Sequence, residues 1–175
     1  MHVQKSWSIL VASAEDLHYI IDGATASTRR GVIPMENALS VSTLNRLGFL
    51  FLAYGTVTDG ELVPEELVVM ANRLKRWLDD RRDVRLVEVV EEAGRVYDQH
   101  ASDDAIRQTA YRYACALRRR LTAPAQRRVI ADLVEIARAD GVVCEGEIRF
   151  MSMVMGVFGI GEPNPLQPTI NNPAI

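Results

Sequence analysis

The sequence predicts an all-α fold, a single-domain bundle of six or seven helices that contains two related helix–turn–helix units. Three observations support this prediction. Apolar residues recur at helical spacing through most of the 175 residues. No segment has the alternating pattern of a half-buried strand. Short breaks with glycine, proline or acidic residues separate the periodic segments, as in a helical bundle.

Composition is that of an ordinary globular protein. With 48% hydrophobic residues the chain can build a core, and a formal net charge of −3 gives no general attraction to nucleic acid or anionic membrane. The longest apolar run, residues 47–54, is far shorter than the roughly 20 residues of a membrane helix. We therefore expect no nucleic-acid partner and no membrane insertion, while peripheral association stays open. Two cysteines make no disulfide framework, and the cytoplasm is the expected location.

Residues 1–35 are expected to form a short helix and a loop packed on the main domain. Ser13, followed by two acidic residues, is suited to cap the helix, and Gly23 to end it. The apolar stretch after Lys5 is too short for a secretory signal peptide. Residues 23–34 are rich in loop-forming residues.

Residues 36–160 are predicted to form the main helical domain, and its first three helices have clear apolar faces. The first covers 36–58 in whole or in part. The second begins at Pro64, which is tolerated at the first helical position. Residues 79–83 separate it from the third. The residues expected to face inward are Leu44, Leu47, Leu50, Phe51 and Tyr54, then Leu67, Met70, Ala71, Leu74, Trp77 and Leu78, then Leu86, Val89, Val90, Ala93, Val96 and Tyr97.

Three more helices complete this domain. Ser102 is the N-cap of the first, and Pro124 opens the second, which ends at Asp140-Gly141. The last runs from about Glu145 to Phe158, and Gly159 is placed to end it. The inward-facing residues are expected to be Ile106, Ala110, Tyr113, Leu117 and Leu121, then Val129, Leu133, Ile136 and Ala137, then Ile148, Met151, Met155 and Phe158.

Residues 161–175 form a Pro- and Asn-rich extended tail with four of the seven prolines. An unstructured end is the simpler expectation. The alternative is that Leu166, Ile170 and Ile175 lie along a groove of this protein or of a partner.

Two stretches of the chain repeat one another. Residues 59–78 align with 140–159 at an offset of 81, and the apolar register continues for three turns beyond the Asp-Gly pair that begins each stretch. We therefore infer two copies of one helix–turn–helix unit. The identical pairs are Asp59 and Asp140, Gly60 and Gly141, Glu66 and Glu147, and Met70 and Met151.

In each copy a Glu follows the Asp by seven residues, a spacing found in part of an EF-hand calcium loop. With the Asp at position 5 of such a loop, the Glu occupies position 12. Positions 1 and 3 then lack carboxylate or amide side chains, so a calcium site within one loop is not expected. Those positions hold Gly55 and Val57 in the first copy, and Ile136 and Arg138 in the second.

A structural joint between helices explains the turns better. Gly60 and Gly141 can take the left-handed conformation that ends a helix. With Val63 and Cys144 as N-caps, the two glutamates fall at the third helical position, where a Glu can bond back to the N-cap amide. The alternative is a metal site assembled across both turns, which requires their four carboxylates to converge. Its ligands would be Asp59, Glu66, Asp140 and Glu147.

At these turns the chain resembles the tellurite-resistance TerB-like family, whose helical domains carry A-x-A-D-G and then an acidic residue that opens the next helix. Residues 137–141 with Glu147 match this motif, whereas residues 57–60 with Glu66 lack the alanines. In that family Ser, Thr or Asp commonly lies three residues before the Glu, and this chain has Val63 and Cys144 there instead.

The resemblance covers roughly residues 40–160. It implies an all-α protein linked to metal or oxyanion stress and to partner assembly, with no established catalysis. Binding of a divalent metal ion through acidic residues has been suggested for such domains. The departures from the motif at Val63 and Cys144 bear on that property in particular.

The two cysteines and three histidines have mainly structural interpretations. Cys144 at a helix start is a candidate reactive thiol for soft metals or tellurium oxyanions, although a small capping residue is the simpler interpretation because nearby acids raise a thiol's pKa. Cys115 is expected to pack beside the inward face of its helix. The histidines have no zinc-ligand spacing. These are His2, His18 and His100.

Five arginines bracket one turn and could contact an anion, RNA or an acidic partner, although a solvated turn is the simpler interpretation because no aromatic residues are interleaved with them. Three glutamates are expected on the outer face of their own helix, or to meet these arginines across the fold. The arginines are Arg118, Arg119, Arg120, Arg127 and Arg128, and the glutamates are Glu88, Glu91 and Glu92.

The functional expectation is a non-catalytic module for metal or oxyanion stress or for assembly, whose acidic turns are structural joints first and candidate ligands of a metal ion second. The alternative is a metal-independent subunit of a larger complex that contacts protein partners through the tail or the arginines. An enzyme is not expected, because no P-loop, nucleophile elbow or base–nucleophile arrangement is present.

Overall fold

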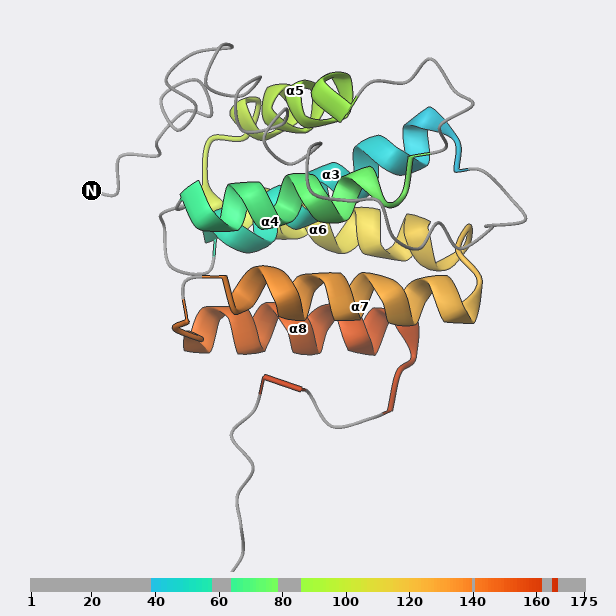
Figure 1. Cartoon of the computed structure of the whole chain (residues 1–175), viewed down its shortest axis with the longest axis vertical. Coiled ribbons are helices and arrows are strands. Elements are labelled where there is room, and N and C mark those ends of the chain that lie inside the picture. The colour runs from blue at the N-terminus through green and yellow to red at the C-terminus, as the bar shows by residue number, and fades with distance from the viewer. Residues whose placement is uncertain (1–38, 58–63, 79–85, 140, 162–164, 167–175) are drawn as a thin grey trace, which may run out of the picture.

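The computed structural model describes residues 39–57, 64–78, 86–139, 141–161 and 165–166 (Figure 1). These residues form six α-helices and no strand, which confirms the predicted all-α fold. The expected helix after Ser13 and most of the tail lie outside the described residues. The helices are α3 (Val41–Val57), α4 (Pro64–Lys75), α5 (Leu86–Asp98), α6 (Asp103–Arg118), α7 (Ala123–Ala137) and α8 (Glu145–Phe158).

Helix α3 is the centre of the bundle and contacts the other five helices. In Figure 1 it lies between α5 and the α7–α8 pair. The predicted apolar stripe of α3 is buried. The buried surface is wider than this prediction, because Phe49, Leu52 and Ala53 on the other faces are also 0% exposed. A helix that is apolar on all sides is stable only where neighbours surround it. The run of apolar residues therefore marks a central helix, not an amphipathic one.

The close contact between α3 and α5 depends on Gly48. A Cβ atom added there would lie 3.1 Å from Cγ1 and 3.4 Å from the carbonyl oxygen of Val89. These distances are at or below the close limit of normal packing, so a side chain at this position would push α5 outward.

The other helices present the apolar faces that the sequence predicts. Most of the expected inward residues are buried, and Leu166 of the tail also belongs to the core. The helix ends follow the local signals: the Ser102 side chain accepts from the Ala105 amide at 3.3 Å, and Gly159 ends α8 at φ 72°. Helix α7 begins at Ala123, capped by Thr122, one residue before the expected Pro124. The expected inward residues that are only half-buried are Leu78, Val96, Tyr113 and Ile148.

Candidate functional site

The two acidic turns precede α4 and α8, and their glutamates occupy the same place in each helix. Pro64 and Glu145 are the first residues of these helices, so Glu66 and Glu147 are both the third. Each is 3% exposed. The offset of 81 residues seen in the sequence is thus kept in the structure, which supports the interpretation of two related units. A carboxylate at this depth requires hydrogen bonds or a counter-charge.

Helix α8 begins with the capping box that the spacing predicts. The Cys144 amide donates to Glu147 Oε2 at 2.8 Å, and the Glu147 amide donates to Cys144 Sγ at 3.4 Å. Sulfur replaces the usual hydroxyl oxygen as the acceptor, and thiol sulfur accepts weakly. The reciprocal bonds fix the Glu147 side chain over the start of its helix. The corresponding N-cap of the first copy, Val63, lies outside the described residues.

Both glutamates raise the pKa of one buried phenol, that of Tyr54. Burial raises the pKa of Tyr54, and the charge of Glu147, the Cys144 thiol and the charge of Glu66 raise it further. Tyr54 lies on the central helix α3 and is 0% exposed. Its phenol is therefore kept protonated. Acidic groups of both repeats thus influence the same residue of α3 electrostatically.

The remainder of the second turn is exposed. Gly141 has the predicted left-handed conformation, with φ 82°, and Val142 and Val143 are 67% and 37% exposed. Asp59, Gly60 and Asp140 lie outside the described residues. Within the described part of the chain, no three or more His, Cys, Asp or Glu side chains are grouped so that they could hold a metal ion. Glu66 and Glu147 would therefore need both aspartates to complete a ligand set.

A calcium loop within the second turn does not fit the structure. Its first ligand position would be Ile136, which is buried in α7 and 0% exposed, and its third would be Arg138 at the end of that helix. Residues that are still helical cannot wrap around an ion as the first half of an EF-hand loop does.

The arginine cluster divides into two groups. Arg118 donates to the Val157 carbonyl at 2.7 Å, and Arg128 donates to the Arg76 carbonyl at 3.1 Å and stacks over Trp77 with 4.7 Å to the ring centroid. These two satisfy helix ends and join elements of the fold. The other three are exposed: Arg119, Arg120 and Arg127.

The neighbouring acids and thiols are also accounted for. Glu92 pairs with Arg95 of its own helix at 2.7 Å and not with the cluster, and Glu88 and Glu91 are exposed. Cys115 and Cys144 form no disulfide and are both half-buried.

Buried Asp132 was not anticipated from the sequence. It is 3% exposed on α7 and accepts a 2.8 Å hydrogen bond from Trp77 Nε1. Burial raises its pKa, while this hydrogen bond and the charges of Arg128, Arg73 and Arg76 oppose the rise. The residues around Asp132 do not indicate that its hydrogen-bond partner lies 55 residues away in the sequence.

The architecture and the paired turns define a class of small all-α proteins with two related helix–turn–helix units. The family model described as "Tellurite resistance protein TerB" matches residues 56–164, which is more than half of the chain. The chain therefore belongs to the TerB family. No curated protein and no solved structure matches it. Among the described helices, none has the length and apolar character needed to span a bilayer.

Proposed function

We propose that the chain is a non-catalytic TerB-family protein of the cytoplasm that serves in metal or oxyanion stress or in assembly, and that it binds a divalent cation between its acidic turns. One observation carries this proposal. Glu66 and Glu147, one from each repeat, are both 3% exposed and both act on the Tyr54 phenol.

The chemistry of the turns suits a hard cation. Carboxylate oxygens are the ligands that Ca²⁺, Mg²⁺ and Mn²⁺ prefer. Two carboxylates acting on one phenol in a buried region repel each other, and a bound cation would offset that repulsion. Asp59 and Asp140 would raise the number of carboxylates to four. The capping box orients Glu147 in advance, as second-shell bonds do in metal sites.

The proposal that the protein is non-catalytic is supported by the chemistry of Tyr54 and Cys144. Tyr54 is held protonated, so it cannot serve as a base at neutral pH. Cys144 accepts a hydrogen bond from the Glu147 backbone amide and so serves as a cap of α8, which is a structural role.

The test is a thermal melt with increasing Ca²⁺, Mg²⁺, Mn²⁺ or Zn²⁺. Binding to the folded state adds about 2.7 kcal/mol of stability at a concentration 100 times the Kd. We expect at least one ion to raise the melting temperature of the wild type. The Glu66→Gln/Glu147→Gln variant should lose this rise, although glutamine still serves in a capping box.

One further variant makes this test decisive. The Glu88→Gln/Glu91→Gln variant removes the same charge from exposed positions of α5 and should keep the wild-type response. A wild type that responds to no ion at millimolar concentration contradicts the proposal. So does an equal loss in both double variants, since that would indicate nonspecific screening.

A second candidate function is a metal-independent interaction subunit, favoured by the exposure of Arg119 and Arg120 after α6 and of Arg127 in the first part of α7. Reversing these three charges to Glu should abolish capture of a specific partner, and removal of residues 167–175 tests the tail separately. Unchanged capture by both variants contradicts this candidate.

A further inference from the structure

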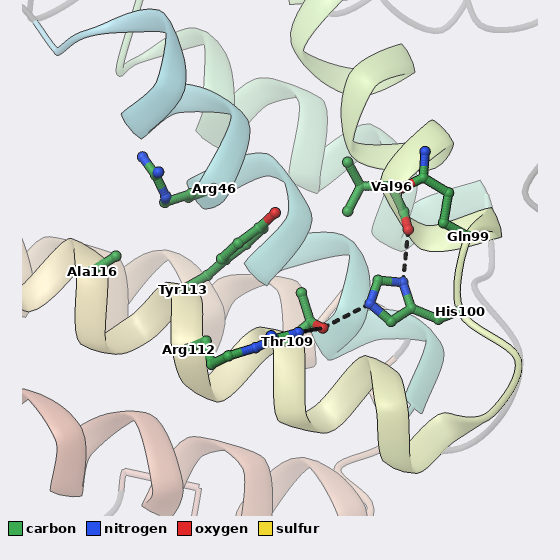
Figure 2. Close-up of a pocket in the computed structure, with 8 residues that line it drawn as sticks. All are labelled: Arg46, Val96, Gln99, His100, Thr109, Arg112, Tyr113 and Ala116. Carbon is green, nitrogen blue, oxygen red and sulfur yellow. Dashed lines mark hydrogen bonds between the residues drawn. The ribbon is translucent and has the colours of Figure 1, made fainter.

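A pocket of about 430 Å³ lies on the bundle among α3, α6 and the end of α5, separate from the acidic turns (Figure 2). Arg46, which lines it, precedes Tyr54 by eight residues on α3, which corresponds to roughly 12 Å along the helix. The other polar lining residues are Gln99, His100, Thr109, Arg112 and Tyr113, and the aliphatic ones are Val96 and Ala116.

The pocket is cationic. Its lining includes two arginines and no acidic residue, although the whole chain has a net charge of −3. Neither Arg46 nor Arg112 forms an ion pair with a carboxylate of the described residues, whereas arginines elsewhere do: Arg73, Arg95, Arg107 and Arg149.

Among the described residues, each of the two guanidinium groups forms one hydrogen bond. Arg46 Nη1 donates to the Ser42 carbonyl at 2.8 Å, and Arg112 Nη2 donates to Thr109 Oγ1 at 2.7 Å. Each guanidinium has five N–H groups, so one bond orients it and leaves donors for a ligand. Figure 2 shows the Tyr113 ring between the two arginines, and the Arg46 guanidinium carbon is 5.8 Å from the ring centroid.

Two other polar lining residues, His100 and Thr109, are bonded to one another. His100 Nδ1 lies 2.7 Å from the Val96 carbonyl, which can only accept, so this nitrogen carries a proton. His100 Nε2 lies 2.7 Å from Thr109 Oγ1, which also accepts from Arg112. The Thr109 hydroxyl can then donate to His100. This network fixes Arg112 without an acid, so the positive charge of the pocket stays available.

We propose that this pocket binds a small organic anion, a phosphate or carboxylate compound with an apolar or aromatic part. Its charged group would bond to Arg46 or Arg112, and its apolar part would lie against Tyr113, Val96 and Ala116. The volume is within the range of small-molecule sites and far larger than one inorganic ion requires. Guanidinium groups match the geometry of carboxylate and phosphate oxygens. This site is independent of the cation proposed at the turns.

The test uses three probes, phenyl phosphate, benzoate and inorganic phosphate, each titrated into the full-length chain by isothermal titration calorimetry. We expect phenyl phosphate or benzoate to bind more tightly than inorganic phosphate, because only these fill the apolar part. Whichever of the two binds better identifies the charged group. Arg46→Gln and Arg112→Gln should each weaken binding by about tenfold or more, as loss of a charged hydrogen bond does.

Two controls separate this site from general charge effects. Arg119→Gln removes the same charge from an exposed position after α6 and should leave affinity unchanged. Ala116→Leu keeps every charge but fills the apolar side, so it should weaken phenyl phosphate and spare inorganic phosphate. Thermal melts confirm that each variant is folded. Absence of binding by all three probes at millimolar concentration, or equal weakening by Arg119→Gln, overturns the proposal.

Discussion

Trp77 and Asp132 lie 55 residues apart in the sequence and are joined by a 2.8 Å hydrogen bond from the indole Nε1 to Oδ2. Trp77 follows α4 and Asp132 belongs to α7, so the bond ties the first repeat to the first helix of the second. Arg128 covers the indole ring, and Arg73 Nη2 bonds Glu135 of α7 at 3.1 Å. One buried carboxylate thus organises the contact between α4 and α7.

Loss of the indole donor should destabilise this contact. Trp77→Phe keeps a buried aromatic ring but leaves Asp132 without its hydrogen bond. We expect the free energy of unfolding to fall by about 1.5–3 kcal/mol from the bond, plus a smaller loss of packing. Urea denaturation measures the change. Tyr111→Phe, at a 51% exposed aromatic, is the control and should change stability by less than about 0.5 kcal/mol.

The Asp132 carboxyl should also shape the pH dependence of stability. Its folded-state pKa lies above the usual 3.8, so the folded protein binds this proton more tightly than the unfolded chain does. The resulting stabilisation is complete below the unfolded pKa and is lost as pH rises through the folded pKa. The Asp132→Asn variant has no carboxyl to ionise at this position, so the stability of the variant should fall less than that of the wild type between about pH 4 and pH 7.

Urea denaturation at several pH values in this range checks that expectation. The matched control is Glu135→Gln, which neutralises an exposed carboxyl of the same helix and should keep the wild-type slope. A slope that is the same in Asp132→Asn and wild type would show that the buried carboxyl does not contribute.

Two helical glycines should respond in opposite directions to alanine. At Gly48 the new Cβ would crowd Val89 at 3.1 Å, and overpacking of a core costs about 1–3 kcal/mol, more than the gain in helix propensity. At Gly156, on an exposed part of α8, nothing lies within 4 Å, so alanine should stabilise by up to about 1 kcal/mol. Denaturant midpoints of the two variants provide the comparison, and a stabilising Gly48→Ala would contradict the close helix contact.

The sulfur cap of α8 should be improved by oxygen. In Cys144→Ser the hydroxyl becomes a stronger acceptor for the Glu147 amide, and we expect a gain of up to about 1 kcal/mol. Cys144→Ala removes the acceptor and should be the least stable of the three. Thermal melts of the three proteins test the predicted order of decreasing stability, Ser, Cys, Ala. If the alanine variant is the most stable of the three, capping is ruled out as the role of this residue.

Tyr54 should contribute to unfolding in alkali. Its folded pKa lies above the ordinary value of 10, so its contribution to stability is present below that value and is lost as pH rises above it. Tyr54→Phe has no phenol to ionise and should unfold at higher pH than wild type. Circular dichroism across the alkaline range measures the two midpoints, and Tyr111→Phe should leave the midpoint unchanged.

Local signals let the sequence predict much of the fold. The N-cap at Ser102, the left-handed Gly159 and the Cys144–Glu147 box depend only on residues a few positions apart. The complete burial of α3 and the position of Asp132 depend on distant helices, so a helical period cannot reveal them. The same holds for the influence of the two glutamates on Tyr54, because the repeat places them in equivalent positions but does not reveal which residue of α3 they affect. The arginine pocket combines three helices and has no sequence motif.

The most direct test of cation binding between the turns is nuclear magnetic resonance of ¹⁵N-labelled protein with substoichiometric Mn²⁺, because this paramagnetic ion broadens only signals near its site. One shared ion predicts that the amide signals of Glu66 and Glu147 broaden together, and before those of the exposed Glu88 and Glu91. If the two amides broaden no earlier than Glu88 and Glu91, or if only one of them responds, the two turns do not hold a common ion.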